Sequence, residues 1–267
     1  MGNEHLAYPS GGALNSRTYG AGRPLVLLHG WGLNSGVWDV VLPRLASQFE
    51  ITCIDLPGCG VNAGSLPEPY SLENISAQLA KSIPAHSIVV GWSLGGLIAQ
   101  YLALHYPHKV AVLVGVATTP CFEQKSQWPG IHPATLKQFQ RQLALNFQTT
   151  LARFLAIQAL GSPNAKSDIK QLQQSISRYP APALSALKQG LKLLSNTDMR
   201  AEIARITQPT LNIYGRLDSL VPATAVELIE QLQPAASQTV IAHAAHAPFV
   251  SHPEEWLSAL FNFFDSQ

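Results

Sequence analysis

A glycine-flanked serine at the end of an apolar run constrains the fold more than any other feature of this sequence. Residues 87–92 (SIVVGW) are almost entirely apolar, which is typical of a strand buried on both faces. Helical spacing follows directly, so the pattern G-x-S-x-G falls where a strand passes into a helix. In so tight a turn, side chains at Gly91 or Gly95 would collide with the neighbouring strand and helix. The pattern therefore predicts a sharp strand-turn-helix that holds the hydroxyl of Ser93 out at the edge of a sheet.

The same alternation of apolar runs and helical patterns extends over most of the chain. The expected strands are residues 24–29, 50–55, 87–92, 110–117, 210–214 and 238–242, and the expected helices are residues 37–48, 71–83 and 253–264. Strands that are apolar on both faces and separated by helices are typical of a doubly wound, mostly parallel α/β sheet. Ligands of such sheets bind outside the carboxyl ends of the strands, so we look for the site there.

Between residues 121 and 192 the pattern changes. Leu, Phe, Gln, Ala and Lys recur at helical spacing, broken by prolines and by a turn at residues 161–163, with no convincing strand. We expect an all-helical insertion at residues 121–192 that covers the site as a lid. The α/β core is then formed by residues 1–120 and 193–267.

Bulk composition narrows the classes of function. The chain has 267 residues and a formal net charge of +1, which argues against a nucleic-acid-binding protein. Its apolar runs are too short to span a bilayer, and the polar N-terminus has no export signal. Three cysteines, Cys53, Cys59 and Cys121, lack metal-ligand spacing. We therefore expect a reduced, cytoplasmic monomer that binds no metal, cofactor, nucleic acid or membrane.

The charges are unevenly distributed along the chain. Residues 121–192 hold nine Lys and Arg against two acidic residues, Glu123 and Asp168, and so carry about +7, whereas the remainder carries about −6. Such a segment is either a solvated helical face or a surface that attracts an acidic partner.

A serine becomes a nucleophile only when a base takes its proton and an acceptor fixes the tautomer of that base. On a sheet of this kind the expected chain order is Ser, then Asp or Glu, then His. Asp218 follows an expected strand in YGRLDSLVP, and His246 follows the last expected strand in AAHAPFVSHP. These positions predict a triad of Ser93, Asp218 and His246.

Other histidines and aspartates compete for these roles. His243 lies nearer the strand, where a structural role is expected, and His252 precedes Pro253 at the start of the last helix. Asp168 and Asp198 belong to helical or inserted segments. Asp55 ends an early strand, where we expect it to shape the following loop.

The tetrahedral intermediate of acyl transfer also needs two hydrogen-bond donors for its oxyanion. HGWG (residues 29–32) follows the first expected strand, and its tryptophan favours an indole that lines a pocket over a simple glycine-rich turn. The backbone N–H groups of Trp31 and Leu94 are the expected donors.

With these motifs placed, the chain resembles α/β-hydrolases that carry a helical lid. It resembles most the pimeloyl-[acyl-carrier protein] methyl ester esterase family of biotin synthesis, over nearly all the chain from Leu25. The resemblance rests on VLLHGWGLNSGVW, DLPGCG, GWSLGGL, TTPCF followed by WPGI, FQRQL with RFLAIQ, YGRLDSLVP and AAHAPFVSHP.

The resemblance implies roles for several residues. It supports Ser93, Asp218 and His246 as the triad, with Trp31 and Leu94 in contact with substrate. It also implies that a lid segment lines the pocket, namely Phe154, Leu155, Ala156, Ile157 and Gln158, although simple helix packing would explain the same residues. Contacts to an acidic acyl-carrier protein would come from Arg153, Lys166 and Lys170.

Two departures from the family pattern bear on these roles. The loop after DLPG reads Cys59-Gly60-Val61-Asn62 where the family usually has an aromatic between glycines and then Arg-Ser. Thr149 stands where a further basic residue is expected, and lysine at 166 and 170 lacks the bidentate geometry of arginine. We therefore expect a change in the pocket edge or in the rigidity of this loop that leaves the triad intact, and weaker or shifted carrier docking.

The resulting expectation is a serine carboxylesterase that hydrolyses the methyl ester of a pimeloyl group on the carrier protein. A general short-chain carboxylesterase with an incidental lid charge is the alternative within the enzymes. A ligand-sensing protein that keeps the fold and triad is the alternative outside them.

Overall fold

The computed structural model describes residues 12–158 and 164–267. Within these ranges a seven-stranded sheet has the order β1-β3-β2-β4-β5-β6-β7, with β1 antiparallel to β3 and every other neighbouring pair parallel. The strands are β1 Ser16–Tyr19, β2 Arg23–Leu28, β3 Phe49–Ile54, β4 Ser87–Trp92, β5 Val110–Val116, β6 Thr210–Gly215 and β7 Ser237–Ile241. The predicted doubly wound α/β fold is confirmed.

Helices cover both faces of the sheet because alternate strand residues point to opposite sides. Leu25 and Leu27 of β2 share a core with α1 (Leu42–Leu45) and α10 (Pro253–Asp265). Val26 and Leu28 pack on the other face with α2 (Leu72–Ser82), α3 (Leu94–His105) and α8 (Ala223–Leu232). Burial on both faces explains why the central strands are continuous apolar runs rather than alternating ones.

The segment predicted as one helix over residues 37–48 is broken in the structure. It forms a 3-10 turn, Ser35–Trp38, followed by the single turn of α1. Pro43 explains the break, because proline lacks an N–H and its ring clashes with the carbonyl four residues earlier. Strand β1 was not predicted, because its side chains alternate between exposed and half-buried and form no apolar run.

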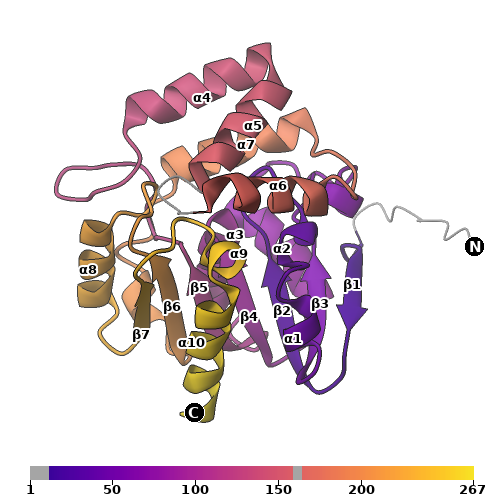
Figure 1. Ribbon diagram of the computed structural model, residues 1–267, viewed down its shortest axis with the longest axis vertical. Coiled ribbons are helices and arrows are strands. Elements are labelled where there is room, and N and C mark those ends of the chain that lie inside the picture. The colour runs from indigo at the N-terminus through magenta and orange to yellow at the C-terminus, as the bar shows by residue number, and fades with distance from the viewer. Residues whose placement is uncertain (1–11, 159–163) are drawn as a thin grey trace, which may run out of the picture.

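The chain between β5 and β6 carries four helices within the described residues. They are α4 (Pro133–Leu145), α5 (Phe147–Gln158), α6 (Ala165–Ile176) and α7 (Leu184–Asn196), and they lie together across one edge of the sheet (Figure 1). Helical structure begins only at Pro133, since the preceding residues form a turn closed by bridges from Glu123 to Ile131 and from Lys125 to Trp128. The predicted break at residues 161–163 and the N-terminal residues 1–11 lie outside the described residues.

The short connections that remain also position the site. One 3-10 turn, Gly60–Asn62, follows β3, and a second, Ile203–Arg205, precedes β6. The single turn of α9 (Pro248–Ser251) leads into α10.

No helix in the described part of the chain is long and apolar enough to cross a membrane. The same residues hold no cluster of three potential metal-binding side chains.

Candidate active site

Ser93 occupies the turn between β4 and α3 in a strained backbone conformation. Its φ and ψ are 55° and −118°, a region that costs a residue with a side chain about 1–3 kcal/mol. Four hydrogen bonds hold it there: its N–H donates to Val116 O (2.9 Å), and its carbonyl accepts from Gly96 N (2.9 Å), Leu97 N (3.1 Å) and Thr118 Oγ1 (2.8 Å). The surrounding structure therefore fixes the strained turn from both sides.

The two flanking glycines are required by close backbone approach. A Cβ on Gly95 would lie 2.5 Å from the carbonyl oxygens of Leu28 and His29, and a Cβ on Gly91 would overlap the backbone of Gly95. Strand β2, strand β4 and helix α3 thus meet too closely for any side chain at these positions, as the sequence pattern predicted.

His246 and Asp218 form a buried hydrogen-bonded pair. The Nδ1 of His246 lies 2.7 Å from Asp218 Oδ2, and both side chains are at most 1% exposed. The other carboxylate oxygen accepts from the backbone N–H groups of Leu220 (2.8 Å) and Val221 (3.1 Å). With Nδ1–H donated to the carboxylate, Nε2 is the ring nitrogen left to accept a proton, and it has no hydrogen-bond partner among the described residues.

The backbone of His246 is tied to the serine turn and to the helices above it. Trp92, which immediately precedes Ser93, donates from Nε1 to the carbonyl of His246 (2.8 Å), and the two rings are 5.8 Å apart. The N–H of His246 donates to the carbonyl of Gln158 at the end of α5 (3.1 Å). The backbone of His246 is thus held by β4 on one side and by the end of α5 on the other, and Asp218 orients its imidazole.

The competing histidines have other surroundings. His243 is exposed. His252 is the residue before α10, makes no side-chain cap hydrogen bond to that helix, and has its Nδ1 2.8 Å from Ser251 Oγ. Neither forms a hydrogen bond to a carboxylate within the described part of the chain.

The competing aspartates are occupied by local structure. Asp55 accepts from the N–H groups of Ser35 (2.6 Å) and Val61 (2.8 Å), so it shapes its loop as predicted. Asp198 pairs with Arg200 at 2.6 Å, and the hydrogen bond from this guanidinium lowers the pKa of the carboxyl. Asp168 lies on α6.

The HGWG loop lies against the serine turn. A Cβ on Gly30 would lie 3.3 Å from the Cβ of Ser93, so this part of the loop is close to the nucleophile. Trp31, whose N–H is an expected donor, is the next residue along the chain. Leu94 is the first residue of α3, whose leading N–H groups have no partner inside the helix. Neither Trp31 nor Leu94 donates its backbone N–H to another described residue. Both groups are therefore available to an oxyanion.

The indole of Trp31 connects this loop to the helices above. It is 2% exposed, donates from Nε1 to the carbonyl of Leu187 on α7 (2.9 Å), and packs edge-on against Phe154 of α5 with ring centroids 4.7 Å apart. The indole is therefore packed between the HGWG loop and the helices, and its predicted role in lining a pocket remains a prediction.

His29 and Thr118 support the site, although the sequence patterns gave them no role. His29 is fully buried, donates from Nδ1 to Gly30 O (2.7 Å) and accepts at Nε2 from Leu56 N (2.9 Å). Burial lowers the pKa of its imidazole.

Thr118 follows Ala117, whose φ of 45° turns the chain back toward Ser93. The position of HGWG after a strand could have indicated His29, whereas no sequence signal indicates Thr118.

The five predicted pocket residues of α5 do not share one face. Phe154, Leu155 and Gln158 are buried, Ile157 is half-buried and Ala156 is exposed. Five consecutive residues span more than one helical turn of 3.6 residues, so they cannot all line one cavity. Phe154 contacts Trp31, and Gln158 bonds to the backbone of His246.

The predicted carrier contacts are exposed and lie on two helices. Arg153 on α5 donates to Gln142 Oε1 of α4 (3.0 Å), and Lys166 and Lys170 lie on α6. Thr149 is exposed, and its N–H donates to Asn146 Oδ1 (3.0 Å).

The unusual loop after DLPG braces the start of α7. The N–H of Ala183 donates to the carbonyl of Gly58 (2.8 Å), and Asn62 donates to the carbonyls of Asp55 (2.8 Å) and Asn15 (2.9 Å). The departure from the family pattern thus lies where the core meets the inserted helices.

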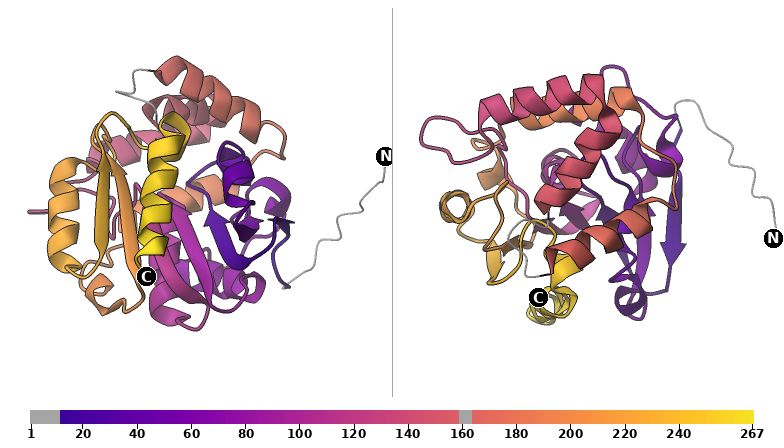
Figure 2. Two further views of the ribbon diagram at one scale, coloured as in Figure 1. Left: turned by 60° about the horizontal axis from the view of Figure 1, so that its bottom comes forward. Right: turned by 45° about the horizontal axis from the view of Figure 1, so that its top comes forward.

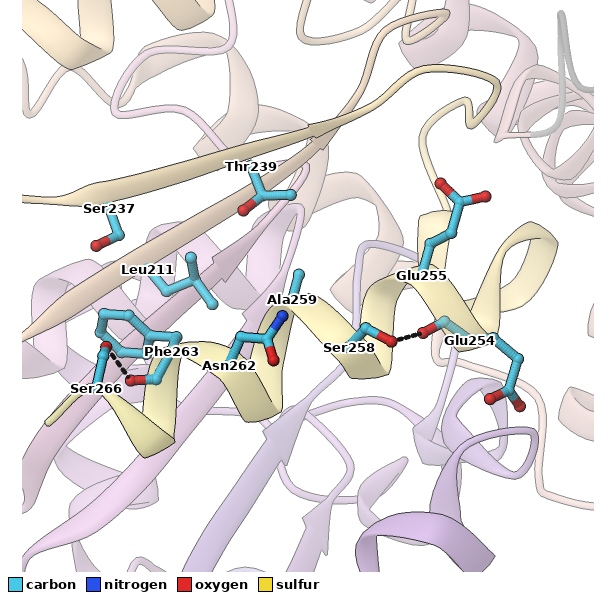
Figure 3. Close-up of a pocket in the computed structure, with 10 residues that line it drawn as sticks. All are labelled: Leu211, Ser237, Thr239, Glu254, Glu255, Ser258, Ala259, Asn262, Phe263 and Ser266. Carbon is cyan, nitrogen blue, oxygen red and sulfur yellow. Dashed lines mark hydrogen bonds between the residues drawn. The ribbon is translucent and has the colours of Figure 1, made fainter.

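A separate open pocket of about 590 Å³ lies between α10 and strands β6 and β7 (Figure 3). It is lined by Leu211, Ser237, Thr239, Glu254, Glu255, Ser258, Ala259, Asn262, Phe263 and Ser266. None of these is a predicted site residue, and the pocket is not part of the site described above.

Comparison with known proteins identifies the family. Residues 23–253 match the model of the alpha/beta hydrolase fold family. The chain is 43% identical to a pimeloyl-[acyl-carrier protein] methyl ester esterase of Aeromonas hydrophila, covering 92% of this chain and 96% of that protein. It is 44% identical to a protein of the same name from Edwardsiella ictaluri, covering 96% and 98%.

A solved esterase from Exiguobacterium antarcticum shares the fold with a TM-score of 0.82 at 22% identity, covering 93% of this chain and 94% of that one. The family match and the full-length relatives lead to one conclusion: the chain belongs to the α/β-hydrolase fold family and, within it, to the pimeloyl-[acyl-carrier protein] methyl ester esterase family.

Proposed function

We propose that this protein is a serine carboxylesterase that hydrolyses the methyl ester of pimeloyl-[acyl-carrier protein]. The observation that carries the proposal is the buried hydrogen bond between His246 and Asp218. It leaves Nε2 of His246 without a partner among the described residues, and Trp92, the residue before Ser93, donates a hydrogen bond to the backbone of the same histidine. The names of the full-length relatives support this substrate.

In the first half-reaction Ser93 Oγ attacks the methyl ester carbonyl while Nε2 of His246 takes its proton. Asp218 keeps Nδ1 protonated and stabilises the imidazolium that forms. The N–H groups of Trp31 and Leu94 donate to the oxyanion, an interaction that is typically worth about 3–4 kcal/mol for each donor. The imidazolium then protonates the departing methoxide, and methanol leaves an acyl-enzyme on Ser93.

In the second half-reaction His246 takes a proton from water, and the resulting hydroxide equivalent attacks the acyl carbonyl. The tetrahedral intermediate collapses, Ser93 recovers its proton from the imidazolium, and the free carboxylate is released. One ester and one water thus become one acid and one methanol.

We further propose that residues 121–192 act as a lid on a core made of residues 1–120 and 193–267. The acyl chain would lie beneath α5 and α7, against Trp31 and Phe154. Ile157 and Gln158, three and four residues after Phe154 on the same side of α5, would complete that wall, whereas Ala156 is exposed. Arg153, Lys166 and Lys170 would contact an acidic carrier protein, and the enzyme would act as a cytoplasmic monomer. The excess of positive charge in this segment supports that partner.

The test is hydrolysis of the methyl ester of pimeloyl-[acyl-carrier protein] by the purified protein, followed by mass spectrometry of the carrier. We expect multiple turnovers, and a loss of kcat of at least about 10⁴-fold in Ser93→Ala, because the nucleophile is removed. A fluorophosphonate should label the wild type but not Ser93→Ala.

Two outcomes would contradict the proposal. Turnover of small esters with none of the carrier-linked ester would indicate a general carboxylesterase. Stoichiometric labelling of Ser93 without turnover of any ester would indicate a sensor.

A further inference from the structure

The outward sides of α4 and α7 carry four exposed cations without neighbouring acids. They are Lys137 and Arg141 on α4 and Lys188 and Lys192 on α7. None forms an ion pair with another described residue. We call these four residues the α4–α7 basic face. By contrast, Lys125 and Arg178 of the same insertion are paired with acidic side chains.

A groove runs between the two helices that bear this face. It has a volume of about 320 Å³ and is lined by Gln140, Ser185, Lys188, Gln189 and Lys192. The four lining residues of α7 recur at three- and four-residue intervals, so they form one stripe along the helix. The helices lie side by side (Figure 2), and Gln140 of α4 donates to Ser195 Oγ of α7 at 3.3 Å.

The opposite stripe of α7 contacts the active site. Leu187 accepts the hydrogen bond of the Trp31 indole, and Gly190 allows a close approach, since a Cβ there would lie 2.6 Å from Trp31 Cδ1. A helix is about 10–12 Å across with its side chains. A partner seated on the basic face would therefore sit about one helix diameter from the HGWG loop.

We propose that the α4–α7 basic face is a second docking surface for an acidic helix of the carrier protein, in addition to the contacts proposed above for Arg153, Lys166 and Lys170. This inference rests on the proposed function. Lys188 and Lys192 are about 6 Å apart along the helix axis, which matches acidic side chains one turn apart on a partner helix. Gln140, Gln189 and Ser185 line the same groove and add amide and hydroxyl groups that can donate to carboxylate oxygens.

The position of this face favours the carrier over a longer polyanion. The residues outside the insertion carry about −6, so an extended nucleic acid that reached past the inserted helices would meet a core of net negative charge. Helix α6, with Lys166 and Lys170, lies on the other side of the group of inserted helices (Figure 2). Lys188 and Lys192 can therefore be tested separately from Lys166 and Lys170, whereas Arg153 adjoins α4 through its hydrogen bond to Gln142.

The experiment compares three variants of the full chain. Lys188→Glu/Lys192→Glu reverses the basic face, and Arg153→Glu/Lys166→Glu/Lys170→Glu reverses the other set. Arg23→Glu/Arg205→Glu is the matched control, because both residues are exposed on the core and the change in net charge equals that of the first variant. Each variant is assayed for binding of an acyl-carrier protein, for kcat/KM on its methyl pimeloyl ester, and for kcat/KM on free dimethyl pimelate.

We expect Lys188→Glu/Lys192→Glu to weaken carrier binding and to lower kcat/KM on the carrier-linked ester about tenfold or more, mainly through KM. The difference should shrink as salt is raised. Activity on dimethyl pimelate should stay within about twofold of the wild type, which shows that the variant is folded. The control should bind the carrier like the wild type within about twofold.

Unchanged carrier binding in Lys188→Glu/Lys192→Glu would overturn the inference, as would an equal loss in the control. Wild-type binding of duplex DNA as tight as that of the carrier, lost in the same variant, would identify an unspecific polyanion surface and would also overturn it. Failure of the proposed function gives a different result, namely no turnover of the carrier-linked ester by the wild type. The binding measurement still decides the inference in that case.

Discussion

Thr118 shows how a side chain outside the predicted triad can control the nucleophile. Its hydroxyl donates to the carbonyl of Ser93, which also accepts two N–H groups from the first turn of α3. A strained conformation persists only where its surroundings over-determine it. Thr118 is fully buried, so water cannot replace its hydrogen bond.

We expect Thr118→Val to lower kcat about tenfold with little change in KM, because the serine turn relaxes while the acyl pocket is unchanged. Stability should fall by about 1 kcal/mol for the lost hydrogen bond. Thr118→Ser keeps the hydroxyl and should restore most of kcat. The rate of fluorophosphonate labelling measures the same effect directly, and labelling at the wild-type rate in Thr118→Val would contradict it.

The residues that sequence reasoning found differ in kind from those it missed. Ser93, Asp218 and His246 follow expected strands, and the parallel sheet brings the ends of those strands to one edge. Thr118 also follows a strand, but its role depends on the positive φ of Ala117. An alanine gives no sign of such a conformation, since positive φ is usually indicated by glycine or asparagine.

At the scale of elements, prediction succeeded where burial is uniform. The central strands, α2 and α10 were expected close to their observed bounds, and a helix was expected directly after Ser93, where α3 begins, because continuous apolar runs and helical spacing are strong signals. The prediction of one helix over residues 37–48 was wrong because Pro43 interrupts it. Strand β1 was not predicted because it is a half-exposed edge strand. The turn at the start of the insertion, around Trp128, depends on contacts that no local pattern records.

Helix α3 offers a test in which two physical effects oppose each other. Intrinsic propensity favours alanine over glycine in a helix by about 1 kcal/mol. At Gly95, however, the added Cβ would meet the backbone carbonyls of Leu28 and His29, which cannot rotate away. We expect Gly95→Ala to lower the free energy of unfolding by about 2 kcal/mol or more, because overpacking outweighs propensity.

Thermal and urea unfolding check this prediction, with Gly190→Ala in α7 as the comparison. There the nearest atoms belong to the Trp31 side chain, so the cost in stability should be smaller. A Gly95→Ala protein as stable as the wild type would show that β2 and α3 can separate without penalty.

At the scale of the whole molecule, buried His29 links stability to pH. Burial lowers the pKa of its imidazole below the ordinary histidine value of about 6.5. As pH falls through that value, the unfolded chain takes up a proton that the folded protein does not. The free energy of unfolding should therefore decrease with falling pH, by up to about 1.4 kcal/mol per pH unit from this group, until the folded-state pKa is reached.

Urea unfolding between about pH 5 and pH 8 measures this slope. His29→Gln keeps an acceptor for the N–H of Leu56 but does not titrate, so we expect a lower stability at neutral pH and a flatter profile below it. The same slope in the variant and the wild type would assign the pH dependence to other groups.

The hydrogen bond from the backbone of His246 to Gln158 has a consequence for how this scaffold can diversify. The last residue of α5 is bonded directly to the residue that accepts the proton, so a change in the position or path of α5 at that end would also displace His246. Outward-facing positions on the inserted helices are free of this restraint. Descendants of this chain can therefore acquire new docking partners through those outer positions more readily than they can acquire a roomier acyl cavity.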